Sequence, residues 1–273
     1  MSSARPSMGR SALSGSLILL AVFLAAWQWL PGIAGIPAFI IPPVSDVAVE
    51  AGRMLRVEHL VAHTGVTLAE VVIGFVLGSL LGMLVGYGLG VSPTAEVLLS
   101  PYILAMQIAP KVAFAPLFVM WFGYTVYPKI LVAVLIVFFP VMINVLGAMH
   151  TLDRDMVSLV RSFSATRLQL FWKLEFPASM PPLFSGLRIA STLAVIGVVV
   201  GEMVGGNTGL GYLLVFGEGQ ANTAMVFVTI IMLTLIGILA YGAVILGERV
   251  GGRGEILERD REGRLSYAMK FVR

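Results

Sequence analysis

Cysteine is absent from this chain of 273 residues, which excludes a disulfide framework, catalysis by a thiol and metal sites with cysteine ligands. Charge is scarce as well: only 12% of the residues are Asp, Glu, Lys or Arg, whereas an average soluble domain has about 25%. A chain with so few charged side chains cannot cover a water-facing surface of its size. The net charge of +3 does not indicate a nucleic-acid partner.

The signatures of common enzyme classes are missing too. No GxxxxGK(S/T) phosphate loop occurs, so the chain itself is not expected to hydrolyse ATP through such a loop. No serine is paired with a plausible catalytic base. Of the three histidines only His59 and His63 share a helical spacing, and they have no third metal ligand nearby. We therefore expect no catalytic residue, no resident metal or cofactor, and no enzyme activity.

Hydrophobic residues make up 58% of the sequence, and long stretches with little or no charge mark where they cross a lipid bilayer. Because about 20 apolar residues span the hydrocarbon core, we predict about six transmembrane helices in an all-α, polytopic membrane protein. The chain is expected to form one domain over 1–273, with its six-helix core near 63–250. The predicted spans are 17–30, 71–95, 97–122 (interrupted by Pro110 and Lys111), 130–152, 183–204 and 219–247.

The distribution of Lys and Arg predicts that both termini lie in the cytoplasm, because cytoplasmic loops of membrane proteins carry an excess of basic residues. With the N-terminus inside, only Arg53, Arg56 and Lys129 lie on the outer side. The basic residues then placed inside are Arg5 and Arg10, the four of a long loop (Arg154, Arg161, Arg167 and Lys173), and those of the tail from Arg249 to Arg273.

An external segment, 37–63, follows the first span. Its sequence Ile41-Pro42-Pro43 indicates an extended stretch, and we expect a helix over 47–55 with Ser45 or Asp46 as its N-cap. This helix either packs on the spans and shields them or offers a docking surface to an external partner.

Glycines recur in the second span at every fourth position. Gly74, Gly78, Gly82, Gly86 and Gly90 therefore line one face of the predicted helix. Such a groove allows another helix to approach closely. We expect tight packing inside the chain, and the alternative is a seam between two copies or a sliding surface.

A polar, basic segment, 158–182, interrupts the apolar spans. Apolar residues fall at helical spacing over 155–176, and Arg and Lys occupy the other faces. The pattern predicts one amphipathic helix that ends at Pro177, because proline cannot continue a helix. A helix of this kind on the cytoplasmic side is a suitable handle for a soluble partner.

A few polar residues within or near the spans are candidates for a solute pathway. Lys111 either lines a pathway or its gate, or forms a structural ion pair or a snorkelling contact. Glu202 lies near the outer end of its span, where it either closes a pathway or is solvated, and Glu70 is expected at the membrane interface. The candidate pathway residues are Gln107, Lys111, Trp121, Asn144 and Glu202.

The polar segment resembles the cytoplasmic loop of binding-protein-dependent ABC-importer permeases, whose pattern is E-A-A-x3-G-x9-I-x-L-P. This chain has Ser158-Leu159-Val160, then Ser164, and then Leu174-Glu175-Phe176-Pro177. It departs from the pattern where Ser158 replaces Glu and Ser164 replaces Gly, although Ser164 can still form a tight turn. The resemblance implies a coupling helix that docks on an ATPase through Ser158, Leu159, Val160, Phe163, Ser164, Ala165, Thr166, Phe176 and Pro177.

A wider resemblance over 37–247 points to the permease branch for nitrate, taurine, aliphatic sulfonates and thiamine-pyrimidine precursors. It rests on IPPVSDV, APKVAFAPLFVMWFG, FFPVMINVLGAM and GLRIASTLAVIGVVVGEMVGGNTGLGYLL. It implies the type I ABC-importer (MetI-like) permease fold in a bacterial inner membrane. It also implies a permease homodimer, an ATPase subunit that binds ATP and Mg, and an extracytoplasmic binding protein.

Local sequences such as Thr67-Leu68-Ala69-Glu70 resemble the pyrimidine-precursor and riboflavin-type permeases more than the sulfonate ones. A thiamine-precursor or riboflavin-like compound is therefore the expected substrate, and a sulfonate, taurine or nitrate is the alternative. An ion-coupled secondary transporter is an alternative of another class, although we see neither inverted repeats nor an ion site at mid-membrane. A membrane-embedded scaffold or enzyme would need no ATPase.

Overall fold

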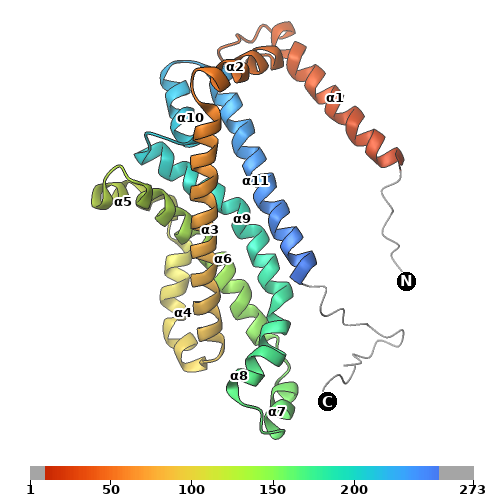
Figure 1. Ribbon diagram of the computed structural model, residues 1–273, viewed down its shortest axis with the longest axis vertical. Coiled ribbons are helices and arrows are strands. Elements are labelled where there is room, and N and C mark those ends of the chain that lie inside the picture. The colour runs from red at the N-terminus through yellow and green to blue at the C-terminus, as the bar shows by residue number, and fades with distance from the viewer. Residues whose placement is uncertain (1–9, 252–273) are drawn as a thin grey trace. The chain divides into compact units, whose positions relative to one another are not determined.

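The computed structural model describes residues 10–251, and every regular element in that range is a helix (Figure 1). Prolines and glycines separate several of the elements, as their sequence positions suggest. The elements are α1 (Arg10–Ile33), α2 (Val44–Arg56), α3 (Leu60–Gly90), α4 (Pro93–Ile108), the 3-10 turn η1 (Lys111–Phe114), α5 (Ala115–Phe122), α6 (Val126–His150), α7 (Arg154–Ser162), α8 (Arg167–Leu170), the π-helical turn η2 (Phe171–Glu175), α9 (Phe176–Gly205), α10 (Leu210–Gly219) and α11 (Thr223–Gly251).

Five stretches of helix within 10–251 are long and apolar enough to cross a membrane, and a sixth span results if the pair α4 and η1–α5 counts as one. That pair is bent by 82° at the break, where Ala109 is extended and Pro110 follows. The predicted number of spans and the predicted interruption at Pro110 are therefore confirmed. Arg5 and the basic residues of 253–273, used above to orient the chain, lie outside the described residues.

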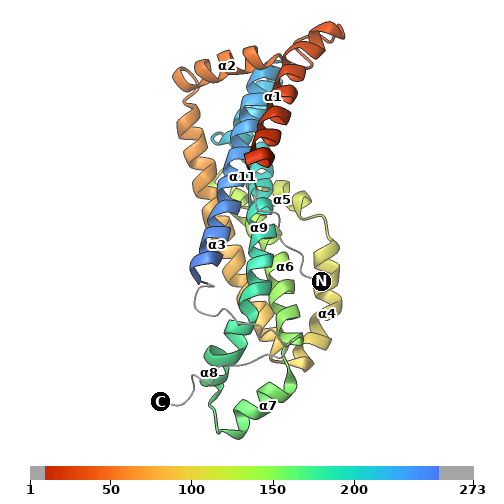
Figure 2. The same cartoon turned by 90° about the vertical axis from the view of Figure 1, so that its right-hand side faces the viewer.

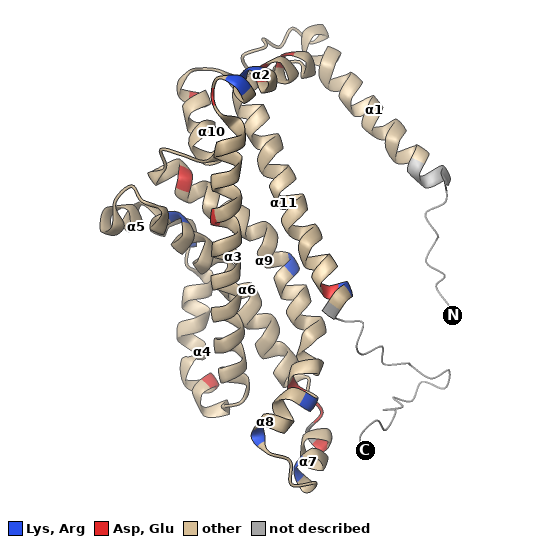
Figure 3. Cartoon of the chain, viewed as in Figure 1, with Lys and Arg blue, Asp and Glu red and all other residues tan. Residues whose placement is uncertain are grey.

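The described chain forms two compact units. The first unit comprises 10–70, 115–129 and 198–235, and the second comprises 71–114, 130–197 and 236–251. Charged residues are few along the long helices; in Figure 3 they gather on α2 in the first unit and on α7 and α8 in the second. The single permease domain expected over 1–273 stays a prediction.

Helix α3 begins at Leu60 and not at Val71 as predicted. The prediction counted only charge-free residues, and Glu70 ended that count. In the structure Glu70 is only 2% exposed, because Lys129 pairs with it. Glu70 is therefore not a solvent-exposed residue at the start of a helix, and its position at the membrane interface stays a prediction.

The glycine face of α3 packs against α6 within the second unit. A Cβ placed on Gly74 would lie 2.6 Å from the Ala133 Cβ, and one placed on Gly78 would lie 2.8 Å from the Val137 Cβ. Close approach to another helix is the reason for glycine at these positions. Packing inside the chain, one of the interpretations considered for the glycine face, therefore accounts for it.

The segment 155–176 is not one helix. It divides into α7 and α8, which are separated by a turn in which Ser164 has a φ of 58°. Thr166 then caps α8 through a capping box with Gln169, so a new helix starts there. Ser164 does form the tight turn that was expected of it.

Pro177 does not end the helix as predicted; it lies in the first turn of α9, and helix continues from Arg167 to Gly205. Proline lacks an N–H and its ring clashes with the carbonyl four residues back. The π turn η2 precedes it, where the Phe176 N–H bonds the Phe171 carbonyl five residues back. The wider π turn changes the backbone spacing at the position where a regular α-helix would clash.

The N-cap of α2 is Pro43, and neither Ser45 nor Asp46 caps the helix as predicted. The Gln28 side chain from α1 takes over this role. Its Oε1 accepts from the Ser45 N–H at 2.9 Å, and its Nε2 donates to the Ser45 hydroxyl at 3.1 Å. A residue 17 positions away thus satisfies a backbone donor that a local cap normally satisfies.

Candidate functional site

The predicted coupling segment, 158–177, lies in the second unit and exposes large apolar side chains. Phe163 is 79% exposed and Leu168 is 68% exposed. Leu159 and Trp172 are also exposed, next to the basic residues Arg161, Arg167 and Lys173. In Figure 2, α7 and α8 lie beyond the end of α6. Exposed aromatic and basic side chains are characteristic of a surface that a protein partner covers.

Local backbone features fix the direction of Phe163. Asp153 caps the start of α7 by accepting from the Asp155 N–H at 2.8 Å. The helix ends at Ser162, and the left-handed turn at Ser164 follows Phe163. Phe163 is therefore at the corner between two capped helices, where it projects without a neighbouring turn of helix to cover it.

The nine predicted coupling residues lie along this surface in three groups. Ser158, Leu159 and Val160 belong to α7, Phe163 to Thr166 form the corner, and Phe176 and Pro177 begin α9. Val160, Ala165, Phe176 and Pro177 are half-buried and the other five residues are exposed.

Three predicted pathway residues lie in the second unit. Lys111 Nζ donates to the Gln107 backbone carbonyl at 2.6 Å and stands 4.7 Å above the centre of the Phe139 ring. A carbonyl and an aromatic face are favourable partners for an ammonium group. Asn144 Nδ2 donates to the Pro140 carbonyl at 2.8 Å, and its Cβ lies close to Gly186. The structure thus brings Gln107 and Lys111 together at the α4–η1 break.

Glu202 lies in the first unit and is fully buried, with 0% exposure. The Thr67 hydroxyl donates to its Oε1 at 2.7 Å, and the Gly211 N–H donates to its Oε2 at 2.6 Å. The Leu210 N–H in turn donates to the Thr67 Oγ1 at 2.8 Å. The solvated helix end considered for Glu202 is therefore wrong, because this carboxyl group fastens the start of α10 to α3.

A buried ion pair adjoins Glu202. Lys129 Nζ lies 2.9 Å from Glu70 Oε1, and the two side chains are 4% and 3% exposed. Glu70 Oε2 is buried without a hydrogen-bond partner among the described residues. An ionised pair survives burial only when the two groups stabilise each other. Sequence reasoning did not pair them, although an acid just before one predicted span and a lysine just before another were visible.

A second pair that sequence reasoning missed joins α9 and α11 in the second unit. Arg188 Nη2 lies 2.8 Å from Glu248 Oε1, and each side chain is about one third exposed. The Arg188 Nε is buried and has no hydrogen-bond partner within 10–251. Intramembrane ionisable residues face a cavity or a partner, which makes Arg188 a further pathway candidate.

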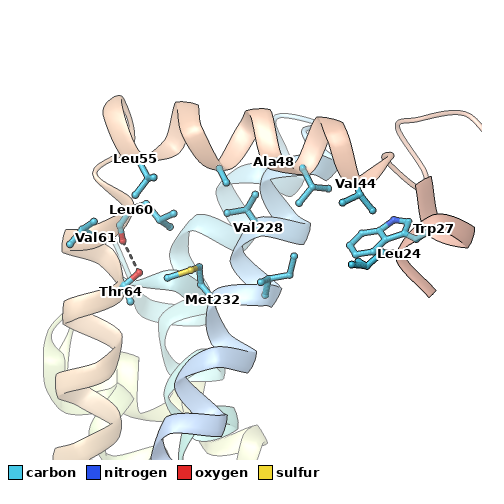
Figure 4. A pocket seen from close by; sticks show the side chains of 13 residues that line it. Leu24, Trp27, Val44, Ala48, Leu55, Leu60, Val61, Thr64, Val228 and Met232 are labelled. Carbon is cyan, nitrogen blue, oxygen red and sulfur yellow. Dashed lines mark hydrogen bonds between the residues drawn. The ribbon is translucent and has the colours of Figure 1, made fainter. Parts of the chain in front are cut away.

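An apolar cavity of about 480 Å³ lies under α2 in the first unit (Figure 4). Trp27 of α1, Val44 and Leu55 of α2, and Met232 of α11 line it. Thr64 contributes a hydroxyl, but this group already donates to the Leu60 carbonyl at 2.7 Å. The cavity offers no polar group to recognise a polar solute.

His63, the second of the two neighbouring histidines, contacts the segment that leads into α10. His63 Nδ1 accepts from the Gly209 N–H at 2.9 Å, and its ring stacks on Tyr212 at 5.8 Å. Residues 10–251 contain no group of three or more His, Cys, Asp or Glu side chains that could hold a metal ion.

Comparison with known proteins identifies a family and a fold. The sequence profile of the family described as "Binding-protein-dependent transport system inner membrane component" matches residues 74–249. Among solved structures, the inward-facing MetNI methionine ABC transporter matches with a TM-score of 0.61 and 19% identity, over 70% of this chain and 95% of that chain. This likeness shows the MetI-like permease fold.

Several curated relatives have named transport functions. The riboflavin transport system permease protein RibX of Chloroflexus aurantiacus is 37% identical over 92% of this chain and 91% of its own length. The formylaminopyrimidine transport permease protein ThiX of Halalkalibacterium halodurans is 35% identical over 85% of this chain and 92% of its own. The taurine transport system permease protein TauC of Escherichia coli is 27% identical over 82% and 83%.

Proposed function

This chain belongs to the family of binding-protein-dependent transport system inner membrane components, and we propose that it forms the solute pathway of its importer and docks a separate ATPase through residues 158–177. It is a multi-pass membrane protein and the permease component of an ABC importer. The family is a transport family and not an enzyme family.

The observation that carries the docking proposal is the exposed apolar surface of the coupling segment. Phe163 is 79% exposed and Trp172 is 57% exposed. The continuous helix from Arg167 to Gly205 has 39 residues, which at about 1.5 Å per residue gives about 58 Å. The hydrocarbon core is only about 30 Å thick, so part of this helix must extend beyond it. Lipid cannot cover such a part, and a protein partner can.

The proposed mechanism assigns the chemistry to the partner and the movement to this chain. The ATPase binds ATP and Mg, and its closure displaces the coupling segment on the cytoplasmic side. A binding protein delivers the solute on the outer side, and two copies of this chain enclose the pathway. The proposed orientation, with both termini inside, follows from the basic residues of α7 and α8.

Co-purification tests the docking proposal. The tagged chain is extracted from its native membranes in mild detergent, and its partners are identified by mass spectrometry. We expect an ABC ATPase subunit to accompany the wild-type chain and to be lost with Phe163→Asp, because a carboxylate cannot enter an apolar contact without a large cost.

A matched control is Phe39→Asp. Phe39 is 69% exposed in the loop before α2, so the same exchange removes an aromatic side chain of similar exposure at a distant position in the sequence. This variant should keep the ATPase. Retention of the ATPase by Phe163→Asp, or its absence from the wild-type preparation, would contradict the docking proposal.

For the substrate we propose a small heteroaromatic solute, such as a formylaminopyrimidine or a flavin. The support is that the riboflavin and formylaminopyrimidine permeases are 37% and 35% identical to this chain, and the taurine permease is 27% identical. The binding protein encoded with this importer would be tested by thermal shift with riboflavin, formylaminopyrimidine, taurine and nitrate. Stabilisation by taurine or nitrate alone would replace this proposal with the alternative.

A further inference from the structure

The π turn η2 is bonded directly to α3 within the second unit. The Tyr87 hydroxyl of α3 donates to Glu175 Oε2 at 2.7 Å. The Tyr87 ring also meets the Phe171 ring edge to face, with centroids 5.0 Å apart. One residue of α3 therefore holds both the first and the last residue of the π turn.

The buried carboxyl group of Glu175 is held in place by its surroundings. Glu175 is 7% exposed, and its backbone carbonyl accepts from the Ser179 hydroxyl at 2.6 Å. A buried carboxyl group needs a donor, and the Tyr87 hydroxyl supplies one. The contact is therefore specific, unlike an incidental surface hydrogen bond.

On the side of the coupling segment, the π turn belongs to a continuous aromatic cluster. Phe171 lies 5.1 Å from Trp172 and 5.6 Å from Phe176, and Trp172 lies 5.2 Å from Phe176, between ring centroids. These rings connect the π turn to the first residue of α9. A displacement of α7 and α8 must therefore pass through this turn before it reaches α9.

On the side of α3, the position of Tyr87 is fixed by its neighbours. A Cβ placed on Gly86 would lie 2.5 Å from the Met142 carbonyl oxygen, and one placed on Gly90 would lie 2.5 Å from the Met149 Cβ. The backbone on both sides of Tyr87 is thus in close contact with α6. Closely packed helices move as one body, so a force applied at Tyr87 acts on α3 and α6 together.

We propose that the Tyr87–Glu175 hydrogen bond is the contact through which movement of the coupling segment is passed to the α3–α6 pair. Tyr87 is then a positioning residue of the transport cycle. π turns inside helices are frequent at functional sites, and here the turn joins the segment that faces the partner to a membrane helix. This inference rests on the proposed docking of an ATPase at 158–177.

The distance between two spin labels tests the inference in the complete complex of permease and ATPase in lipid nanodiscs. Because the chain has no cysteine, Ser162→Cys and Leu84→Cys place one label on the exposed end of α7 and one on the exposed face of α3. Each complex is measured without nucleotide and after trapping with ATP and orthovanadate, which requires no transported solute.

In the otherwise unaltered chain we expect the same distance distribution in both states, because the two labelled parts move together. With Tyr87→Phe, which removes only the hydroxyl, we expect trapping to shift the distribution. The population of molecules in which the two labels keep the distance seen without nucleotide should fall about ten- to a hundredfold. This is the effect of losing a hydrogen bond to a charged group. Glu175→Gln keeps an acceptor without the charge and should give an intermediate shift.

The matched control is Tyr102→Phe on α4, because Tyr102 is 67% exposed and loses the same atom; its distribution should stay unchanged. ATP hydrolysis should persist in every variant, which separates lost transmission from lost folding. A nucleotide-dependent shift in the unaltered chain, or no shift with either Tyr87→Phe or Glu175→Gln, would overturn the inference. Failure of the ATPase to co-purify at all would overturn the docking proposal instead.

Discussion

The contact between α3 and α6 predicts that one methyl group has opposite effects at two positions of the same helix. At Gly82 an added Cβ would lie 2.7 Å from the Phe138 carbonyl oxygen and 3.0 Å from the Val141 Cβ. At Gly88 it would meet nothing within 4 Å. We therefore expect Gly82→Ala to destabilise the protein and Gly88→Ala to stabilise it or leave it unchanged.

The size of the effect follows from two terms. Replacing Gly by Ala inside a helix gains up to about 1 kcal/mol in either variant. Only at Gly82 does the methyl group meet backbone, which cannot rotate away, so α3 must withdraw from α6. Overpacking of this kind costs about 1–3 kcal/mol. The shared helix term cancels in the comparison, and the free energies of unfolding of the two variants should differ by about 1–3 kcal/mol.

Thermal unfolding in detergent, followed by the fluorescence of the four tryptophans, measures this difference. Each kcal/mol corresponds to about 2–4 °C in a protein of this size. Gly82→Ala should therefore melt several degrees below Gly88→Ala. If the two variants melt together, the glycine face is not in close contact with α6 and the reasoning is refuted.

Three further predictions concern other contacts. Lys129→Met should lower the free energy of unfolding by about 3–5 kcal/mol because it leaves the Glu70 carboxyl group buried without a cation. The double variant with Glu70→Gln should recover most of this loss in the same melting assay. The hydrogen bonds from Arg53 hold the pKa of Glu50 below its usual value, so the stability that ionised Glu50 gives the fold is complete above about pH 4.3 and is lost as the pH falls through the lowered pKa. The melting temperature of Glu50→Gln should therefore depend less on pH in this acidic range than that of the unaltered chain. Equal dependence would contradict the assignment. Ser164→Gly should raise the melting temperature, since a φ of 58° costs a non-glycine residue about 1–2 kcal/mol. Co-purification of the ATPase should be retained. A lower melting temperature would show that Ser164 stabilises the turn by another contact.

The sequence predicted those features that depend on composition and on short spacings. The scarcity of charge indicated the membrane, the glycine period indicated a close helix contact, and Pro110 indicated the break after α4. Each of these signals reports a property of neighbouring residues. The family resemblance extended them to a fold, which the structural comparison supports.

Features that depend on distant partners could not be predicted in this way. Glu202 was considered as a solvated end because its hydroxyl donor, Thr67, lies 135 residues earlier. The pairing of Glu70 was missed because its partner, Lys129, lies 59 residues later. The helix was expected to end at Pro177 because the π turn that accommodates this proline has no recognised sequence pattern.

The hydrogen bond between Thr67 and Glu202 also has a consequence for the order of synthesis. Ribosomes add about 5–20 residues per second, so the 135 residues between them take about 7–27 s. Lys129 is made partway through that interval, 59 residues after Glu70. From then on Glu70 and Lys129 can pair, whereas the Thr67 hydroxyl still lacks its acceptor. Glu70 of α3 and Lys129 of α6 can therefore pair first, and the buried polar network is completed only when α9 and α10 have left the ribosome.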